Sequence, residues 1–219
     1  MKRRAPLTMA LLVIITLIWL YEASIHAPDS DVMLARLGAI LPGMLQRHEY
    51  WRLVAAMFLH ASWLHWLVNS WALYQLGTLF EIFFGTRRFA VVYFVSGIVA
   101  SAASSLRGHE GVGASGAIFG ILGALVISVW RSPRYRHQPW TRGLIRQLVF
   151  WIAVNIVIGF SVNEVMTQVH RPEYIDNTAH IAGLIAGLIL GFLPHREPPP
   201  PPAESVIDVE PRYDHYGSE

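Results

Sequence analysis

A serine lies among glycines and other small residues in the stretch 112–120, at the start of a long apolar run. A serine hydroxyl in such surroundings can act as a nucleophile where water is scarce. Small residues at four-residue spacing are also the usual contact surface of membrane helices, so Ser115 alone indicates close helix packing more than chemistry. The interpretation therefore depends on three other polar residues, His65, Asn69 and His180, and on the elements that carry them.

The composition indicates a protein with several membrane spans. Of the 219 residues, 53% are hydrophobic, and the mean hydropathy of +0.39 exceeds what a soluble core of this size requires. The chain has no cysteine, which excludes disulfides and thiolate metal sites. The net charge of +2 is small, and the arginines lie in short stretches between apolar segments. A lipid bilayer is therefore the expected environment, and no nucleic-acid partner is expected.

Six apolar segments approach the roughly 20 residues that cross a hydrocarbon core of about 30 Å. They cover approximately residues 7–21, 62–83, 89–106, 115–130, 148–162 and 178–193. We therefore predict an all-α membrane protein whose six transmembrane helices form one bundle over residues 1–195. The first segment follows three basic residues as a signal peptide would, but Ile25 makes Ala27 a poor cleavage site, so an uncleaved helix is favoured.

Basic residues predict the orientation of the bundle. With a cytoplasmic amino terminus, twelve basic residues lie inside and five outside. Both termini are therefore expected to be cytoplasmic, and the compact chain without a convincing transit peptide favours a bacterial plasma membrane. The end of the chain, residues 196–219, runs from Arg196 and Glu197 through prolines at 198–202 and becomes acidic, which predicts a disordered tail.

The connection between the first two spans, residues 22–53, is long for a loop without structure of its own. Ser30-Asp31 can cap a short helix lying in the outer membrane interface, and Pro42-Gly43 is expected to end it. Trp51 and Arg52 suit the same interface, Trp51 as a ring at headgroup level and Arg52 as a snorkelling charge.

The candidate polar residues agree in depth. In this orientation the second, fourth and sixth spans all run inward, and His65 with Asn69, then Ser115, then His180 lie at their outer ends. Scattered structural residues would have no reason to agree in this way, so the agreement indicates one site in the outer leaflet.

Glycine spacing predicts that the serine and the histidine meet. Steps of three and four residues put His180 on one face of its span with Gly183, Gly187 and Gly191, and a similar ridge of Gly116, Gly120 and Gly123 lies beside Ser115. Such ridges let two backbones approach until the Ser115 hydroxyl lies within about 3 Å of a His180 ring nitrogen. His180 can then serve as general base and general acid.

An oxyanion also needs hydrogen-bond donors. His65 and Asn69 are one helical turn apart and project from the same face, so they can donate together with the backbone N–H of Ser115. His60 is off that face by about 140° in a regular helix. We interpret His60 as a hydrogen bonder that ties the loop near a helix start, which Ser62 can cap.

Two acidic residues and a cluster of histidines offer alternatives to a serine–histidine dyad. Asp176 precedes His180 by one turn at the water boundary, so a dyad rather than a triad is expected, and Glu81 at the inner end of the second span is interpreted as structural. A transporter or metal site built from His60, His65 and His180 is another alternative. The metal site is disfavoured, because no acidic residue lies within the spans near these histidines and HExxH is absent. No metal and no cofactor are therefore expected.

Four motifs together resemble the rhomboid family of intramembrane serine proteases, over residues 49–191. They are Trp51-Arg52, the pattern HxxxxHxxxN of His60, His65 and Asn69, the GxSG of Gly113, Ser115 and Gly116, and the AHxxGxxxG that starts at Ala179-His180. The resemblance implies a six-helix core with Ser115 as nucleophile and His180 as base. It also implies an oxyanion hole of His65, Asn69 and the Ser115 backbone, and an interfacial loop that contains Trp51-Arg52. Phe119 stands where many bacterial relatives carry a tyrosine that stacks on the catalytic histidine, so the ring contact should survive.

The expected function is therefore an intramembrane serine endopeptidase that cleaves transmembrane protein substrates near the outer membrane face. On the resemblance, a substrate would enter between the second and fifth spans and unwind locally, while the loop 163–176 acts as a lid. A catalytically silent rhomboid-like protein that binds membrane clients is the alternative. The joint presence of the polar site residues disfavours it, because a binder needs none of them. The natural substrate and the oligomeric state stay open.

Overall fold

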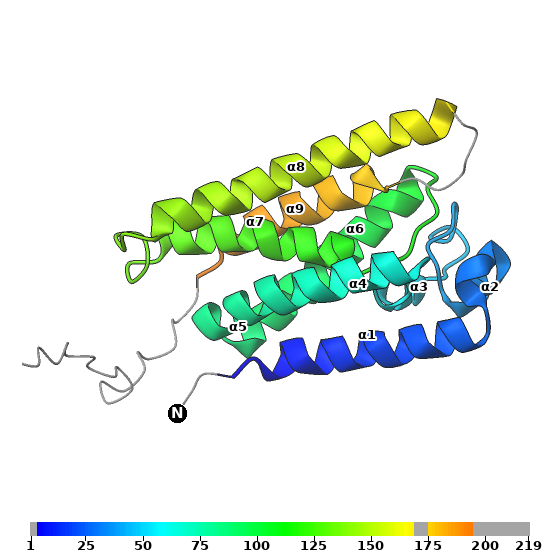
Figure 1. The fold of residues 1–219 in the computed structure, drawn as a ribbon, viewed down its shortest axis with the longest axis horizontal. Helices are drawn as coiled ribbons and strands as arrows, with labels where there is room; N and C mark the ends of the chain where they lie inside the picture. Colours follow the sequence, from blue (N-terminus) through cyan, green and yellow to red (C-terminus); the bar gives the residue numbers. More distant parts are fainter. Residues whose placement is uncertain (1–3, 169–174, 195–219) are drawn as a thin grey trace, which may run out of the picture.

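The computed structural model describes residues 4–168 and 175–194, and within these ranges the chain is helical, with one isolated β-bridge between Ile40 and Gly111. The predicted tail and the middle of the predicted lid lie outside the described residues. The larger helices are α1 (Pro6–Ser24), α4 (Trp63–Ala72), α6 (Thr86–Leu106), α7 (Ser115–Arg131), α8 (Thr141–Gln168) and α9 (Asn177–Gly191). The shorter elements are η1 (Ala27–Asp29), α2 (Asp31–Leu37), α3 (Arg52–Ala55), η2 (Ala56–Phe58), η3 (Leu73–Gly77) and α5 (Thr78–Phe84). The long helices run roughly along one direction, and α2 and α3 lie at one end of the bundle, away from the amino terminus (Figure 1).

Three of the described helical stretches are long and apolar enough to cross a membrane: Pro6–Ser24, Thr86–Leu106 and Thr141–Asn163. The apolar helices α7 and α9 are shorter, with 17 and 15 residues. The segment predicted as the second span is helical, and consists of α4 and α5 joined by the π-helical turn η3. A π-helical turn adds a residue to the local repeat, and hydropathy alone does not reveal it.

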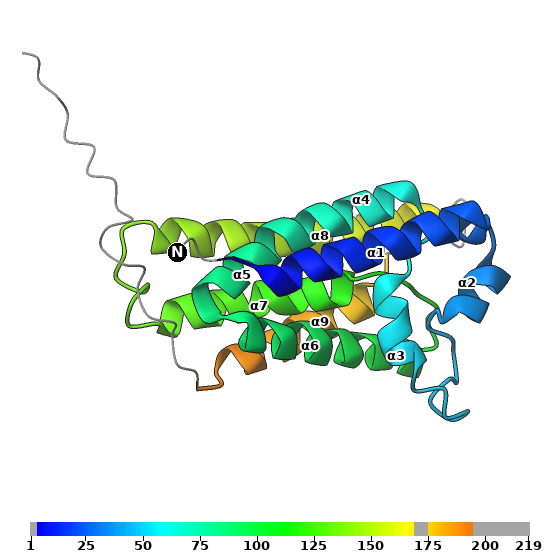
Figure 2. The same cartoon turned by 90° about the horizontal axis from the view of Figure 1, so that it is seen from below.

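Helix α7 is the centre of the bundle, since every residue from 116 to 125 is buried. Its glycines meet those of α9: a Cβ on Gly183 would lie 2.1 Å from the carbonyl oxygen of Gly116, and a Cβ on Gly187 would lie 1.9 Å from that of Gly120. The two helices run side by side in both views (Figure 2). The close approach predicted from the glycine spacing is therefore confirmed.

Helix α1 is fixed at its start by a carboxylate from another helix. The buried Glu81 accepts hydrogen bonds from the backbone N–H groups of Leu7 and Thr8, at 3.0 and 2.8 Å. The hydroxyls of Thr8 and Thr86 also donate to it, each at 2.7 Å. Because the first N–H groups of a helix have no partner within that helix, Glu81 acts as a cap from a distance, which is the structural role that the sequence predicted.

The helix predicted in the connection between the first two spans is present, but its predicted end is wrong. Ser30 caps α2 as expected by accepting a hydrogen bond from the Met33 N–H. The helix ends at Gly38, with φ of +118°, and not at Pro42-Gly43. Gly38 is needed there because a Cβ would lie 2.5 Å from the Trp51 ring, a contact between distant residues that local sequence does not reveal.

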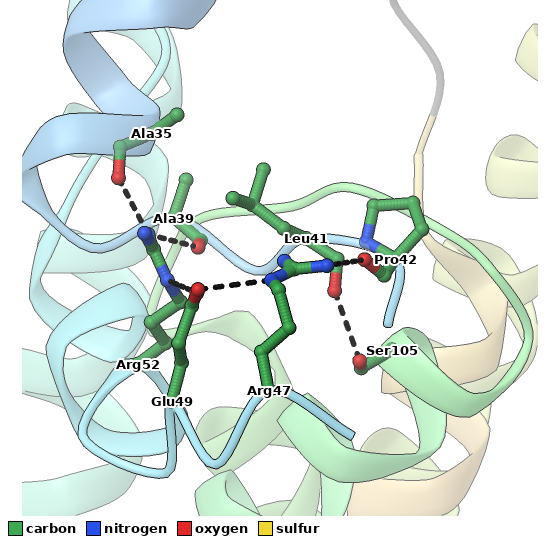
Figure 3. A network of polar contacts seen from close by, with 8 residues as sticks. All are labelled: Ala35, Ala39, Leu41, Pro42, Arg47, Glu49, Arg52 and Ser105. Carbon is green, nitrogen blue, oxygen red and sulfur yellow. Dashed lines mark hydrogen bonds and ion pairs between the residues drawn. The ribbon is translucent and has the colours of Figure 1, made fainter. Parts of the chain in front are cut away.

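Arg52 does not snorkel, so that part of the prediction is wrong. Its side chain is only 11% exposed and donates hydrogen bonds to the carbonyl oxygens of Ala35, at 2.5 Å, and Ala39, at 3.1 Å, at the end of α2 (Figure 3). Glu49 pairs with both Arg52 and Arg47, and hydrogen bonds from Arg47 and then Arg52 lower the pKa of its carboxyl. Arg52 is thus the cap that closes the loop, because the carbonyls at a helix end favour a cation.

Candidate active site

Ser115 is the first residue of α7 and follows a turn at Gly113, where φ is +121°. His180 lies in the first turn of α9, which begins where the Asp176 carboxylate accepts a hydrogen bond from the Ala179 N–H. The glycine contacts between these helices bring the two residues together, and the distance from His180 Nε2 to Ser115 Oγ is 2.9 Å. An unprotonated Nε2 at this distance can accept the hydroxyl proton of the serine.

The His180 ring is held by packing rather than by a carboxylate. Phe119, one turn after the serine, stacks on it with ring centroids 4.3 Å apart and planes 11° apart. Among the described residues no group hydrogen-bonds the buried Nδ1 of His180. The Asp176 carboxylate instead binds Ser104, His109 and the Ala179 N–H. The geometry agrees with a dyad and with the expected stacking of Phe119.

His65 and Asn69 lie beside the turn that leads into Ser115. A Cβ on Gly113 would lie 2.6 Å from Cε1 and 2.7 Å from Nε2 of His65, and 3.6 Å from Nδ2 of Asn69. Asn69 is buried, and its side-chain amide donates to the His65 carbonyl at 3.0 Å, which leaves its second N–H for another acceptor. The absent side chain of Gly113 therefore makes the room that the His65 ring occupies next to the serine turn.

Gly116, the residue after the serine, lets a third helix approach. A Cβ there would lie 2.4 Å from the Cβ of Ala100 on α6. The site is therefore built from α4, α7 and α9, with α6 packed against the residue that follows Ser115.

His60 is fully buried, and it ties the loop through its main chain. Its N–H donates to both carboxylate oxygens of Glu22, at 3.1 and 3.3 Å, while its ring lies edge-on to the His65 ring with centroids 5.2 Å apart. Ser62 caps α4 as predicted, accepting from the His65 N–H at 3.2 Å.

The sequence-based statement that no acidic residue lies near the histidines is wrong. Glu22 belongs to α1 because that helix runs to Ser24, beyond the end predicted at residue 21, and the carboxylate is fully buried beside His60. A charged residue at the very end of an apolar run was the available signal, since ionisable groups in spans are expensive and have a reason to be there. Within the described ranges, no group of three or more His, Cys, Asp or Glu residues could hold a metal ion.

Trp51 and Arg52 belong to the loop between α1 and α4 and not to the serine site. The Trp51 ring packs on Gly38 and its residue remains half exposed, and the Arg52 guanidinium lies 4.7 Å from its ring centroid. At the other side of the site, the amide of Asn163 binds both the N–H and the carbonyl of Ile175 at 2.7 and 2.8 Å. This pair joins α8 to the start of α9 at the two ends of the predicted lid.

A serine hydroxyl bound to an imidazole, with two polar side chains beside the turn that precedes the serine, is an arrangement suited to acyl transfer. The imidazole removes the proton, and the donors stabilise the negative charge that develops on a carbonyl oxygen.

Comparison with known proteins gives consistent matches. The family model described as "Rhomboid domain" matches residues 47–197. RHOMBOID-like protein 1 of Arabidopsis thaliana is 34% identical over 167 residues, which is 75% of this chain and 40% of that protein. Rhomboid protease GluP of Bacillus subtilis is 32% identical over 174 residues, 79% of this chain and 31% of that protein. RHOMBOID-like protein 2 of Arabidopsis thaliana is 34% identical over 180 residues, which is 80% of this chain and 51% of that protein. The chain thus spans between about a third and a half of the length of these relatives.

Proposed function

Because the chain belongs to the membrane-embedded rhomboid family, we propose that it is an intramembrane serine endopeptidase that cleaves transmembrane segments of membrane proteins. The observation that carries the proposal is the 2.9 Å contact between Ser115 Oγ and His180 Nε2 at the start of the central helix α7. One of the relatives, GluP, is a protease by its name.

In the first half of the reaction, Ser115 Oγ attacks the scissile carbonyl carbon and its proton moves to His180 Nε2. The new negative charge on the carbonyl oxygen is stabilised by the Ser115 N–H together with His65 and Asn69. The C–N bond then breaks, His180 gives the proton to the leaving amine, and an acyl ester remains on Ser115.

In the second half, a water molecule attacks the ester and His180 takes its proton. The C–O bond to Ser115 breaks and the proton returns to Oγ. The stacked Phe119 holds the imidazole at the same place for both transfers, which is what a dyad without an orienting carboxylate requires.

We place the active site toward the outer membrane face, with both chain ends cytoplasmic, in a six-span bundle of a bacterial plasma membrane. The excess of basic residues at the opposite end of the bundle supports this orientation. Substrate entry between α4 and α8 is supported by their large exposed apolar side chains, among them Trp63, Leu67, Phe150 and Val157.

The test is labelling of the purified protein in detergent with a fluorophosphonate probe, which needs no knowledge of the substrate. Wild-type protein is expected to label, and Ser115→Ala and His180→Ala are expected not to. Equal labelling of wild type and Ser115→Ala would contradict the mechanism. Absence of labelling in folded wild type would favour the client-binding alternative.

A further inference from the structure

The short segment between α3 and α4 sets two parts of the site at once. At its beginning, the carbonyl oxygen of Ala56 accepts a hydrogen bond from the Gly113 N–H at 2.8 Å, which fixes the turn before the serine. At its end, Ser62 Oγ accepts from the His65 N–H, which fixes the first turn of α4. The position of this segment therefore decides how Gly113 and His65 lie against each other.

The middle of the segment is held by a single buried carboxylate on another helix. Glu22, in the last turn of α1, is fully buried, and both of its oxygens lie within hydrogen-bond distance of the His60 N–H. His60 is fully buried in turn, and its ring supports the edge of the His65 ring. A continuous series of contacts therefore joins α1, through His60, to the ring of His65, the proposed hydrogen-bond donor to the oxyanion.

Burying a carboxylate is costly unless its hydrogen bonds repay the loss of water. Glu81 shows the ordinary solution in this protein, since its oxygens accept four hydrogen bonds at the start of α1. The two oxygens of Glu22 converge on one N–H, that of His60. This contact joins the last turn of α1 to the loop that carries His60.

We propose that Glu22 is a positioning residue for the oxyanion site: its carboxylate holds the His60 main chain, and through it the His65 ring against Gly113. This proposal rests on the proposed function of the same site. It concerns the length and the acceptor oxygen of the side chain, because the contact is a hydrogen bond to a backbone N–H.

Three substitutions separate this role from an effect of charge. Glu22→Gln keeps the length and one acceptor oxygen, Glu22→Asp keeps the charge but withdraws it by one methylene, and Glu22→Leu keeps the bulk without an acceptor. If Glu22 is a positioning residue, the maximal rate of fluorophosphonate labelling of Glu22→Gln should lie within about threefold of the wild-type rate. Glu22→Asp and Glu22→Leu should lower this rate at least tenfold. The probe concentration at half-maximal rate should stay unchanged, since Glu22 touches no bound probe. Glu81→Gln is the control, because it alters a buried carboxylate at the other end of α1 and should lower thermal stability without lowering the rate in folded protein.

Hydrogen exchange provides a readout that does not depend on activity. The peptide covering 56–66 should exchange at least about tenfold faster in Glu22→Leu and Glu22→Asp, since the buried His60 N–H loses its acceptor, while α7 stays protected. Wild type that does not label would refute the proposed function, and the exchange result would still decide the role of Glu22. Unchanged exchange at 56–66 in Glu22→Leu, or an active Asp variant beside an inactive Gln variant, would overturn the positioning role.

Discussion

Replacing Gly113 by alanine is expected to lower the rate of Ser115 labelling by fluorophosphonate about a hundredfold. The added Cβ would lie 2.6 and 2.7 Å from two atoms of the His65 ring, closer than real Cβ atoms approach carbon or nitrogen. The ring must therefore move away from the serine turn, or the turn must move away from the ring. Under the proposed function, either change removes one oxyanion donor, and loss of one such donor costs about 10²- to 10³-fold in rate.

The substitution also strains the backbone, because φ at Gly113 is +121°. Backbone strain of this kind costs about 1–3 kcal/mol, so part of any loss of activity could come from unfolding. Gly108→Ala separates the two effects. Gly108 also has a positive φ, of +76°, but a Cβ there would meet nothing within 4 Å. Its alanine variant should lose a comparable amount of stability and keep its labelling rate.

The assay compares the maximal labelling rates and melting temperatures of wild type, Gly113→Ala, Gly108→Ala and His65→Ala in one detergent. The double variant Gly113→Ala with His65→Ala should label no more slowly than His65→Ala alone, because the ring that clashes is gone. A Gly113→Ala variant that labels as fast as Gly108→Ala would refute the placement of His65 in the oxyanion site.

Two further outcomes follow from the packing and the loop. Gly187→Ala should lower the melting temperature strongly, because its Cβ would lie 1.9 Å from the backbone oxygen of Gly120 and overpacking typically costs about 1–3 kcal/mol; Gly143→Ala, in open space, should not. The lowered pKa of Glu49 predicts that its stabilisation of α2 is fully present above the ordinary value of 4.5 and is lost as the pH falls through the lower folded value. Hydrogen exchange of 31–38 should therefore accelerate only at acidic pH, and Glu49→Gln should abolish this pH dependence.

The parts of the fold that the sequence predicts are those set by local rules. Ser30, Ser62 and the glycines of α7 and α9 act through neighbours within one or two turns, or through a spacing that repeats along a helix. The contact between Ser115 and His180 was predictable because both glycine ridges point the two helices at each other. The stacking of Phe119 on His180 was implied by the family resemblance, and the two ring centroids lie 4.3 Å apart.

The parts that sequence reasoning missed depend on contacts between distant segments. Gly38 ends α2 because Trp51 packs there, and Arg52 is drawn inward by the carbonyls that this ending exposes. An apolar run ends at its first charge and therefore places Glu22 in the loop, although the helix continues to Ser24. In each case the residue that makes the contact lies far away along the chain, and neither periodicity nor hydropathy indicates the contact.

The capping of the three helices at the site has a consequence for the chemistry. Helices α4, α7 and α9 all begin there, with His65, Ser115 and His180 in their first turns. Ser62 and Asp176 occupy N–H groups at the starts of α4 and α9, whereas within the described residues no side chain caps α7. The first N–H groups of a helix carry partial positive charge and need an acceptor. The start of α7 therefore has no side-chain acceptor among the described residues. Under the proposed function, the carbonyl oxygen of the bond that Ser115 attacks would supply this acceptor as its negative charge develops.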